Sequence, residues 1–194
     1  IAVEIPTTRG RLVDGGRLQA MAFRDARGSD SSNHDERLWS VGDWREVVWI
    51  DMEDVDSPDD DLRKRGHAAG ATLVSRGEGL HWGDGEMYLT ATSGGPIQFV
   101  ESMDEKAINM ADNLTVAPWG HLIVCEDNYS SEIRNHLRGV TPDGKLYTIG
   151  RNVFLGNSEF AGAVFSPDGG TLFVNIQYPG ITVAITGPWD AIRT

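Results

Sequence analysis

Positive charge, cysteine and long apolar runs are all scarce in this sequence. Lys and Arg number 17 against 29 Asp and Glu, so the formal net charge is −12. That balance argues against nucleic acid or an anionic membrane surface as a partner, because both need a basic face. The single cysteine, Cys125, excludes an internal disulfide. No apolar run approaches the length of a transmembrane helix, so we expect no membrane-spanning segment.

Several catalytic motifs are missing as well. The five histidines show no His-Glu-x-x-His spacing, which argues against a zinc hydrolase. A Gly-x-Ser-x-Gly motif is absent, and the glycines fall in turns rather than in a phosphate-binding loop. The sequence opens at Ile1 in what reads as a strand already under way, without an initiator Met or a signal peptide. We therefore expect a fragment of a longer protein.

The sequence does contain three copies of one layout, namely a carboxylate, a β-rich run, a turn and a second β-rich run. The copies begin at Glu78, Asp112 and Glu159, which are 34 and 47 residues apart. In the first copy Asp84-Gly85 separates the two runs, a strong hairpin signal because glycine takes positive φ without steric cost. The 23 glycines and six tryptophans are typical of a turn-rich β protein.

Repeats of this length, built from short strands and turns, predict the blades of a β-propeller. We expect an all-β fold in which residues 1–194 form one propeller portion with short helical insertions. At about 40–50 residues per blade, the chain supplies about three to four blades. So few blades leave unpaired edges and an exposed core. Completion by the remaining propeller segment of the same protein, or by a partner chain, is therefore expected.

Other elements follow from local patterns. Residues 1–28 read as two strands joined by a turn at Asp14-Gly15-Gly16, and residues 41–51 as a buried strand. The acidic run 51–61 lacks the glycine and terminal glutamate of an EF-hand loop, so we favour a solvated loop leading into a helix over 61–69. Thr141-Pro142-Asp143-Gly144 predicts the turn of a hairpin.

The three leading carboxylates should converge in such a fold. The first strand of each propeller blade lines the central channel, so we expect Glu78, Asp112 and Glu159 near one end of its axis. Without a cation these groups would repel each other and their pKa values would rise. A hard cation such as calcium, which binds about six to eight oxygens, removes that repulsion. Asn113 and Asn175 are further candidate oxygen ligands.

Two more acidic residues, Glu126 and Asp127, end the second run of the second copy. Because side chains alternate along a strand, only one of the two should point toward the channel, unless the strand ends there. A structural interpretation competes with the metal site for all of these carboxylates. In that interpretation they cap strands or form separate surface ion pairs with Arg76, Arg134 or Arg151.

Large and soft side chains complete the pattern. Trp82, Trp119 and Trp189 recur near turns, where we expect each to fill the core of a blade. Cys125 is expected to pack as a small hydrophobic residue.

Several ordered motifs carry a family resemblance. In the third copy they are Glu159-Phe160-Ala161-Gly162, Phe165-Ser166-Pro167-Asp168-Gly169, Thr171-Leu172-Phe173-Val174-Asn175-Ile176-Gln177 and Ile185-Thr186-Gly187-Pro188-Trp189. Earlier come Glu78-Gly79, Met87-Tyr88-Leu89-Thr90, Asp112-Asn113-Leu114 and Cys125-Glu126-Asp127. Together these motifs, from Trp44 to the end of the sequence, resemble the C-terminal part of PhoX-type alkaline phosphatases.

The resemblance implies a six-bladed propeller that hydrolyses phosphomonoesters at a cluster of iron and calcium ions in its central channel. It also implies export to the periplasm or the cell exterior. The positions that match the metal-binding residues of the family are Glu78, Asp112, Asn113, Glu126 and Glu159. We therefore interpret the chain as part of a metal-dependent phosphomonoester hydrolase that uses calcium and iron.

Two positions depart from the family pattern. The iron-binding cysteine of the family lies in an Asn-Cys-x-Gly-Gly segment that this sequence lacks, so that role is not transferred to Cys125. Tyr178 stands where the family often has His after Asn-Ile-Gln. Two alternative functions remain open, a non-catalytic calcium-binding propeller and a calcium-dependent lactonase or esterase.

Overall fold

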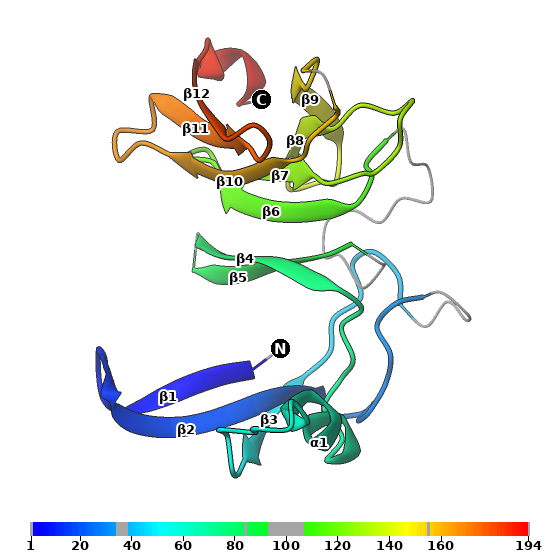
Figure 1. The fold of residues 1–194 in the computed structure, drawn as a ribbon, viewed down its shortest axis with the longest axis vertical. Coiled ribbons are helices and arrows are strands. Elements are labelled where there is room, and N and C mark those ends of the chain that lie inside the picture. Colours follow the sequence, from blue (N-terminus) through cyan, green and yellow to red (C-terminus); the bar gives the residue numbers. More distant parts are fainter. Residues whose placement is uncertain (1, 34–38, 84, 93–106, 155, 194) are drawn as a thin grey trace. The chain divides into compact units, whose positions relative to one another are not determined.

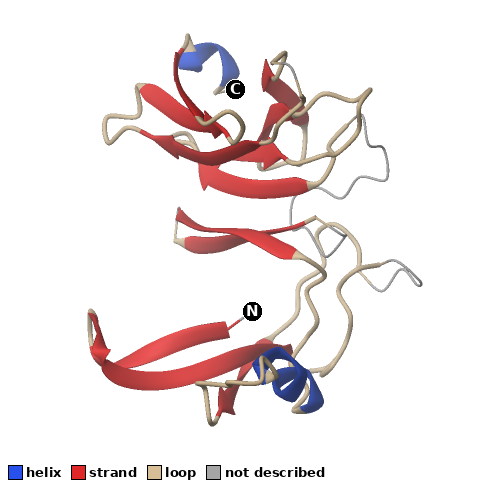
Figure 2. Ribbon diagram, in the orientation of Figure 1, coloured by secondary structure: helices blue, strands red, loops and turns tan. Residues whose placement is uncertain are grey.

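Antiparallel β-sheets are the main regular structure in the computed structural model of the chain (Figures 1 and 2). The structure describes residues 2–33, 39–83, 85–92, 107–154 and 156–193. Within these ranges there are twelve strands, one short α-helix and one 3-10 helix, which confirms the all-β expectation with short helical insertions. The chain divides into two compact units, residues 1–75 and residues 76–194.

The first unit is a three-stranded antiparallel sheet in the order β1-β2-β3, followed by a helix. Its elements are β1 (Ala2–Thr8), β2 (Arg11–Phe23), β3 (Val47–Met52) and α1 (Leu62–Ala68). The expected helix is confirmed, with Asp61 as its N-cap residue. Just before it, the Ser57 hydroxyl accepts the amide N–H groups of Asp61 and Leu62, both at 3.0 Å.

Two expectations for the first unit were wrong. The chain turns at Arg9 and Gly10, between β1 and β2, whereas Asp14-Gly15-Gly16 lies inside β2. The register against β1 shifts there, and Gly15 has a φ of 76°, so the glycine supplies an irregularity within the strand instead of its end. Strand β3 begins only at Val47 and is half exposed: Trp49 shows 42 % of its surface.

The second unit contains three further sheets, visible in green to red in Figure 1. The two-stranded sheet is β4 (Gly77–Gly83) and β5 (Glu86–Ala91). The four-stranded sheet is β6 (Ala111–Val116), β7 (Leu122–Glu126), β8 (His136–Val140) and β9 (Leu146–Arg151). The three-stranded sheet is β10 (Phe160–Phe165), β11 (Thr171–Ile176) and β12 (Ile181–Thr186), followed by the 3-10 helix η1 (Trp189–Ile192).

These sheets match the three copies of the sequence layout and stack as propeller blades do. Strand β6 lies beside β4 on one side and β10 on the other, so the first strands of successive sheets are neighbours. The expected hairpin joins β8 to β9, where the Thr141 amide N–H donates to the Lys145 carbonyl at 2.9 Å. The blade expectation therefore agrees with the sheets that the structure describes.

Strand β7 sits at the centre of the unit and is buried along its whole length. Ile123 and Cys125 point into a core shared with β10 and β11, which includes Leu172 and Val174. The alternate residues of β7 point into a second core shared with β5 and β6. Burial of Cys125 raises the pKa of its thiol to about 12, so its expected packing as a small hydrophobic residue is confirmed.

The three tryptophans behave differently. Trp119 and Trp189 stack in the first of these cores with ring centroids 5.6 Å apart, and the Trp189 indole N–H donates to the Gly170 carbonyl at 2.8 Å. Trp82, in contrast, exposes 65 % of its surface on β4, so its expected place in a blade core was wrong. Sequence position near a turn did not distinguish a stacked indole from an exposed one.

Candidate metal centre

The first strands of the three sheets share one irregularity. In each, two residues stand opposite a single residue of the next strand, which is the geometry of a β-bulge. The paired residues are Glu78-Gly79 in β4, Asp112-Asn113 in β6 and Gly162-Ala163 in β10. Glu78 and Asp112 thus occupy equivalent positions, each as the first residue of its bulge.

Glu159 does not occupy that position. It precedes β10, and the equivalent of Glu78 and Asp112 is Gly162, which has a φ of 61°. A side chain is strained in that left-handed conformation, so the third repeat carries glycine in the bulge. The expectation that Glu159 is the third copy of the same position was therefore wrong, although its carboxylate still reaches the same place from outside the strand.

Hydrogen bonds join the neighbouring bulges. The Thr90 hydroxyl accepts the Gly79 amide N–H at 2.8 Å and donates to the Asp112 carbonyl. The Gly162 amide N–H donates to the side-chain oxygen of Asn113 at 2.7 Å. A Cβ atom on Gly79 would lie 2.4 Å from the Asp112 carbonyl oxygen, so only glycine allows this approach. The bulges therefore hold β4, β6 and β10 in a fixed relation, with Asn113 as a bridge between blades.

Three carboxylates meet at this end of the strands. One oxygen each from Asp112, Asp127 and Glu159 lie within 4.8 Å of one another; we call this group the carboxylate cluster. Asp112 comes from the β6 bulge, Asp127 directly follows β7, and Glu159 directly precedes β10. Asp127 is held by its amide N–H, which donates to the Met110 carbonyl at 3.0 Å.

The close approach of like charges shows in the pKa values. Partial burial, together with Asp127 and Asp112, raises the pKa of Glu159 to about 8. The pKa of Asp112 is also raised, mainly by burial and further by the charges of Glu78 and Asp127. The cluster therefore disfavours ionisation of all its carboxylates at once, an effect that a bound cation would offset.

Glu78 lies beside the cluster, within electrostatic reach of Asp112. Its carboxylate is 3.6 Å from the Arg76 guanidinium. Tyr129 links the Arg76 guanidinium to the cluster. Its hydroxyl donates to Asp127 at 2.8 Å, and its hydrogen bond with Arg76 raises the pKa of the guanidinium. An arginine therefore stands at the rim of an otherwise acidic group.

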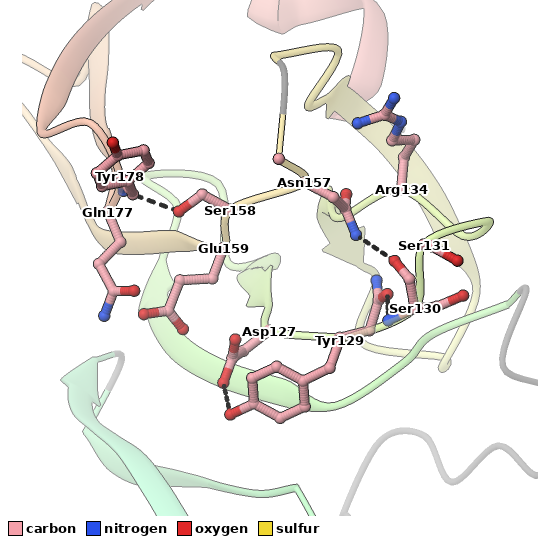
Figure 3. A pocket seen from close by; sticks show the side chains of 12 residues that line it. Asp127, Tyr129, Ser130, Ser131, Arg134, Asn157, Ser158, Glu159, Gln177 and Tyr178 are labelled. Carbon is pink, nitrogen blue, oxygen red and sulfur yellow. Dashed lines mark hydrogen bonds between the residues drawn. The ribbon is translucent and has the colours of Figure 1, made fainter.

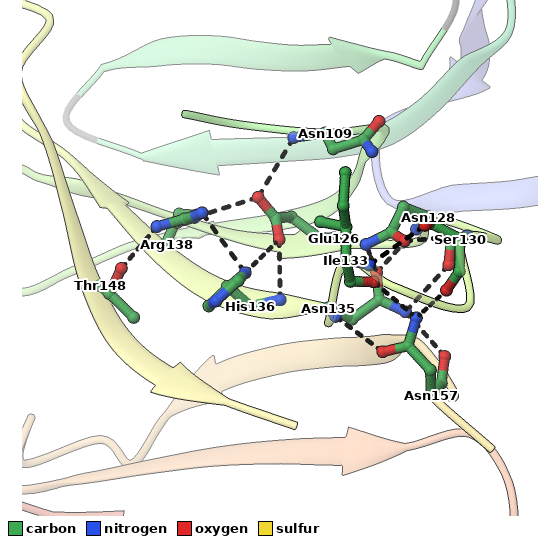
Figure 4. A network of polar contacts seen from close by, with 10 residues as sticks. All are labelled: Asn109, Glu126, Asn128, Ser130, Ile133, Asn135, His136, Arg138, Thr148 and Asn157. Carbon is green, nitrogen blue, oxygen red and sulfur yellow. Dashed lines mark hydrogen bonds and ion pairs between the residues drawn. The ribbon is translucent and has the colours of Figure 1, made fainter. Parts of the chain in front are cut away.

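Glu126 lies elsewhere, in a buried network drawn in Figure 4. Its two oxygens accept the amide N–H of Asn109 at 3.1 Å and that of His136 at 2.8 Å. They also contact His136 Nδ1 at 2.9 Å and Arg138 Nε at 3.0 Å. Both oxygens are thus engaged, and strand alternation directs Glu126 away from the cluster that Asp127 joins. The structure gives Glu126 ion-pair partners in place of the ligand role expected for it.

The structure therefore brings together only some of the residues that the sequence predicted as one site. Asp112 and Glu159 come together, Glu78 and Asn113 flank them, and Glu126 is separate. Asp127 is the cluster member that the expected ligand set lacked. Alternation along β7 was the available signal, since it allowed only one of the adjacent acidic residues to face the channel.

A polar pocket of about 590 Å³ opens beside the cluster (Figure 3). Asp127 and Glu159 form one edge of it, and their carboxylates point toward each other. The remaining wall carries the Arg134 guanidinium and is rich in hydroxyl and amide groups, including those of Ser130, Asn157, Ser158, Gln177 and Tyr178. Such a lining suits a small polar ligand that forms several hydrogen bonds.

The donors of the cluster fit a hard cation. All three are carboxylates, and oxygen-only donor sets suit calcium, magnesium or manganese better than softer metals. Cys125 faces the core between the sheets, so it offers no thiolate to this place. The chemistry of the residues present therefore agrees with calcium, whereas iron is implied by the family resemblance alone.

A scan against protein families identifies the chain. The family model described as Alkaline phosphatase PhoX matches residues 4–102 and 95–180, which is most of the sequence, so the chain belongs to the PhoX family. No curated protein and no solved structure matches the sequence. Within the part of the chain that the structure describes, no helix is long and apolar enough to cross a membrane.

Proposed function

We propose that this member of the PhoX family forms part of a metal-dependent phosphomonoester hydrolase, with the carboxylate cluster as part of its metal centre. One observation carries the proposal. Carboxylates from three separate segments meet at the edge of a polar pocket, although partial burial and the neighbouring Asp127 and Asp112 raise the pKa of Glu159 to about 8. A fold tolerates such an arrangement at functional sites, where a ligand offsets the repulsion.

The chain supplies the following groups. Asp112, Asp127 and Glu159 are the proposed cation ligands, and Glu78 adds negative charge beside them. When bound, such an ion neutralises phosphate oxygens and helps to orient the nucleophile for in-line attack. Arg76, paired with Glu78 at 3.6 Å, brings a positive charge to the rim that an arriving phosphate group would meet.

The pocket supports a small polar ester as substrate. Its hydroxyl and amide groups lie next to Asp127 and Glu159, so they are placed to bind the alcohol portion of a phosphomonoester held at the cluster. Calcium and iron as cofactors, export from the cytoplasm, and completion of the propeller by the remaining segment of the protein are proposals that rest on the family. The sheets of the second unit support the last of these, since they resemble blades of a larger ring.

Elemental analysis and a phosphatase assay on the full-length protein test the proposal. We expect bound calcium, and hydrolysis of p-nitrophenyl phosphate that a chelator abolishes. Glu159→Gln should lower calcium content and turnover together, by about tenfold or more, because it removes an anionic ligand. Asp190→Asn is the matched control. Asp190 is exposed, and within the described part of the chain its ion-pair partner is Arg193, at 2.9 Å.

Other outcomes would point to the competing functions. Calcium without phosphatase activity, together with hydrolysis of a lactone or carboxylic ester, would replace the phosphatase by a calcium-dependent lactonase or esterase. Calcium with no turnover of either class would indicate a non-catalytic calcium-binding propeller. If Glu159→Gln kept the calcium content of the wild type, the cluster would not be the metal centre.

A further inference from the structure

Three asparagines, two of them buried, form a chain of hydrogen bonds on the right of Figure 4. They are Asn128, Asn135 and Asn157; we call them the asparagine clamp. Asn135 is fully buried and Asn128 exposes 2 % of its surface. Amide side chains are seldom buried unless their hydrogen bonds are satisfied. The hydrogen-bond partners of these side chains therefore explain what holds them in place.

Asn135 is the centre of the clamp. Its side-chain oxygen accepts the backbone N–H and the side-chain N–H of Asn128, both at 2.7 Å. Its side-chain nitrogen donates to the carbonyls of Asn128 at 3.2 Å and Asn157 at 3.0 Å. All four hydrogen-bonding positions of the Asn135 amide are therefore used within the clamp.

Asn157 closes the clamp from the other side. Its side-chain oxygen accepts the Asn135 backbone N–H at 2.9 Å. Its side-chain nitrogen donates to the carbonyls of Ser130 and Ile133, both at 2.9 Å. The loop that follows β7 is thus joined to the segment that precedes β10 by side chains on both of them.

The clamp joins the two segments that carry cluster residues. Asp127 directly precedes Asn128, and Glu159 follows Asn157 with only Ser158 between them. Asp112 needs no such device, because its backbone is fixed within β6 and its carbonyl accepts the Thr90 hydroxyl. Asp127 and Glu159 both lie outside the strands, so without a restraint nothing in β7 or β10 would fix the spacing of their two side chains.

We propose that the asparagine clamp is a positioning device, which holds Asp127 and Glu159 at the spacing needed to bind one cation. The inference rests on the proposed metal centre, and its central residue, Asn135, is outside the lining of the polar pocket, whereas Asn128 and Asn157 also belong to that lining. Holding ligands in place before the ion arrives raises affinity, since less order has to be imposed on binding. The clamp holds the backbone of Asn128 and Asn157, which lie one and two residues from Asp127 and Glu159, so it acts on the proposed ligands as outer partners of a metal site do.

Calcium binding to the full-length protein, measured by titration calorimetry with calcium alone, tests the clamp. Asn135→Ala should weaken calcium binding by about 10–100-fold, as loss of an outer partner does at other metal sites. Tyr147→Phe is the matched control: it removes a partly buried hydrogen bond at 3.0 Å between Tyr147 of β9 and His121, which directly precedes β7. Because His121 precedes β7 and Asp127 follows it, the control should change calcium affinity less than about twofold.

A double substitution separates positioning from general stability. If Asn135 acts through the spacing of Asp127 and Glu159, Asn135→Ala should weaken calcium binding much less in an Asp127→Asn background than in the wild type. Losses that multiply in the double variant would overturn the proposal. Asn157→Ala, which removes fewer contacts from a less buried position, takes the place of Asn135→Ala if that variant does not fold.

Crystal structures of the metal-free variants give a readout that does not depend on metal binding. The distance between the Asp127 and Glu159 carboxylates should increase in Asn135→Ala and stay unchanged in Tyr147→Phe. A wild-type protein that binds no calcium would refute the metal centre, while this distance would still decide whether the clamp positions the two side chains. An unchanged distance, or wild-type calcium affinity in Asn135→Ala, would overturn the clamp.

Discussion

Glu126 and Asp127 are neighbours in the sequence, yet they lie in opposite electrostatic surroundings. Glu126 is fully buried, and Arg138 Nε and His136 Nδ1 lie 3.0 Å and 2.9 Å from its oxygens. Asp127 belongs to a cluster in which one oxygen from each of three carboxylates lies within 4.8 Å of the others. In the first group opposite charges and hydrogen bonds are matched, whereas in the second like charges are brought together.

The difference shows how to separate a structural acid from a functional one. A buried carboxylate that has cationic and N–H partners on both oxygens is stabilised by the fold itself, and removing it leaves those partners unsatisfied. A carboxylate held near others of the same sign is stabilised only when a proton or a cation joins the group. Burial and acidity are common to both groups, so only the partners distinguish them.

The largest expected effect is loss of stability on removing Glu126. Glu126→Ala leaves Arg138 and His136 without their carboxylate in a buried network, which should lower the free energy of unfolding by about 3–5 kcal/mol. Urea denaturation of the metal-free protein measures this change. Asp127→Asn should differ from the wild type by only about 0.5 kcal/mol, since it removes a repelled charge without leaving a cavity.

Two results would contradict this distinction between the Glu126 network and the carboxylate cluster. A loss below about 1 kcal/mol in Glu126→Ala would show that the network contributes no more than an ordinary surface contact. A larger loss in Asp127→Asn than in Glu126→Ala would mean that the cluster, rather than the network, stabilises the metal-free fold.

The second prediction concerns pH, and it applies to the cluster alone. In the folded metal-free protein the pKa of Glu159 is about 8, against a usual value of 4.5. Between these values the folded state binds more protons than the unfolded state, so this group's contribution to stability is complete below pH 4.5 and is lost as pH rises toward 8. Calcium affinity should rise over the same interval, by at most about tenfold per pH unit for each proton displaced.

Comparison with Glu159→Gln isolates this effect from other titrating groups. Urea denaturation at a series of pH values should show a steeper decrease in stability for the wild type than for the variant between pH 4.5 and 8. Parallel curves would show that Glu159 is ionised throughout this interval, and that the cluster does not suppress its ionisation.

Much of the second unit could be predicted from the sequence. Asp84-Gly85, Thr141-Pro142-Asp143-Gly144 and Ser166-Pro167-Asp168-Gly169 are local turn signals, so the strands on either side could be placed before the structure was known. The blade pattern predicted that Asp112 and Glu159 converge, although Glu159 reaches the cluster from the residue before β10 and Glu78 lies beside it. Local signals of this kind depend only on residues close together in the chain.

What the sequence did not predict depends on contacts between distant residues. The equivalence of Glu159 with Glu78 was wrong because the third bulge carries Gly162, a fact visible only in strand register. The choice between Glu126 and Asp127 depended on where β7 ends and on partners such as Arg138. The turn expected at Asp14-Gly15-Gly16 proved to be an irregularity within β2, since glycine with positive φ serves either purpose.

The smallest expected effect concerns the rim of the cluster, where Tyr129 donates to Asp127 at 2.8 Å. Tyr129 exposes 74 % of its surface, so water can replace its hydroxyl at the carboxylate. Tyr129→Phe should therefore change calcium affinity by about twofold at most, measured by calorimetry beside Asn135→Ala. A tenfold loss of calcium affinity would show that the exposed Tyr129 hydroxyl contributes as much to calcium binding as the buried Asn135 side chain. It would also show that exposure is a poor guide to which hydrogen bonds position the cluster.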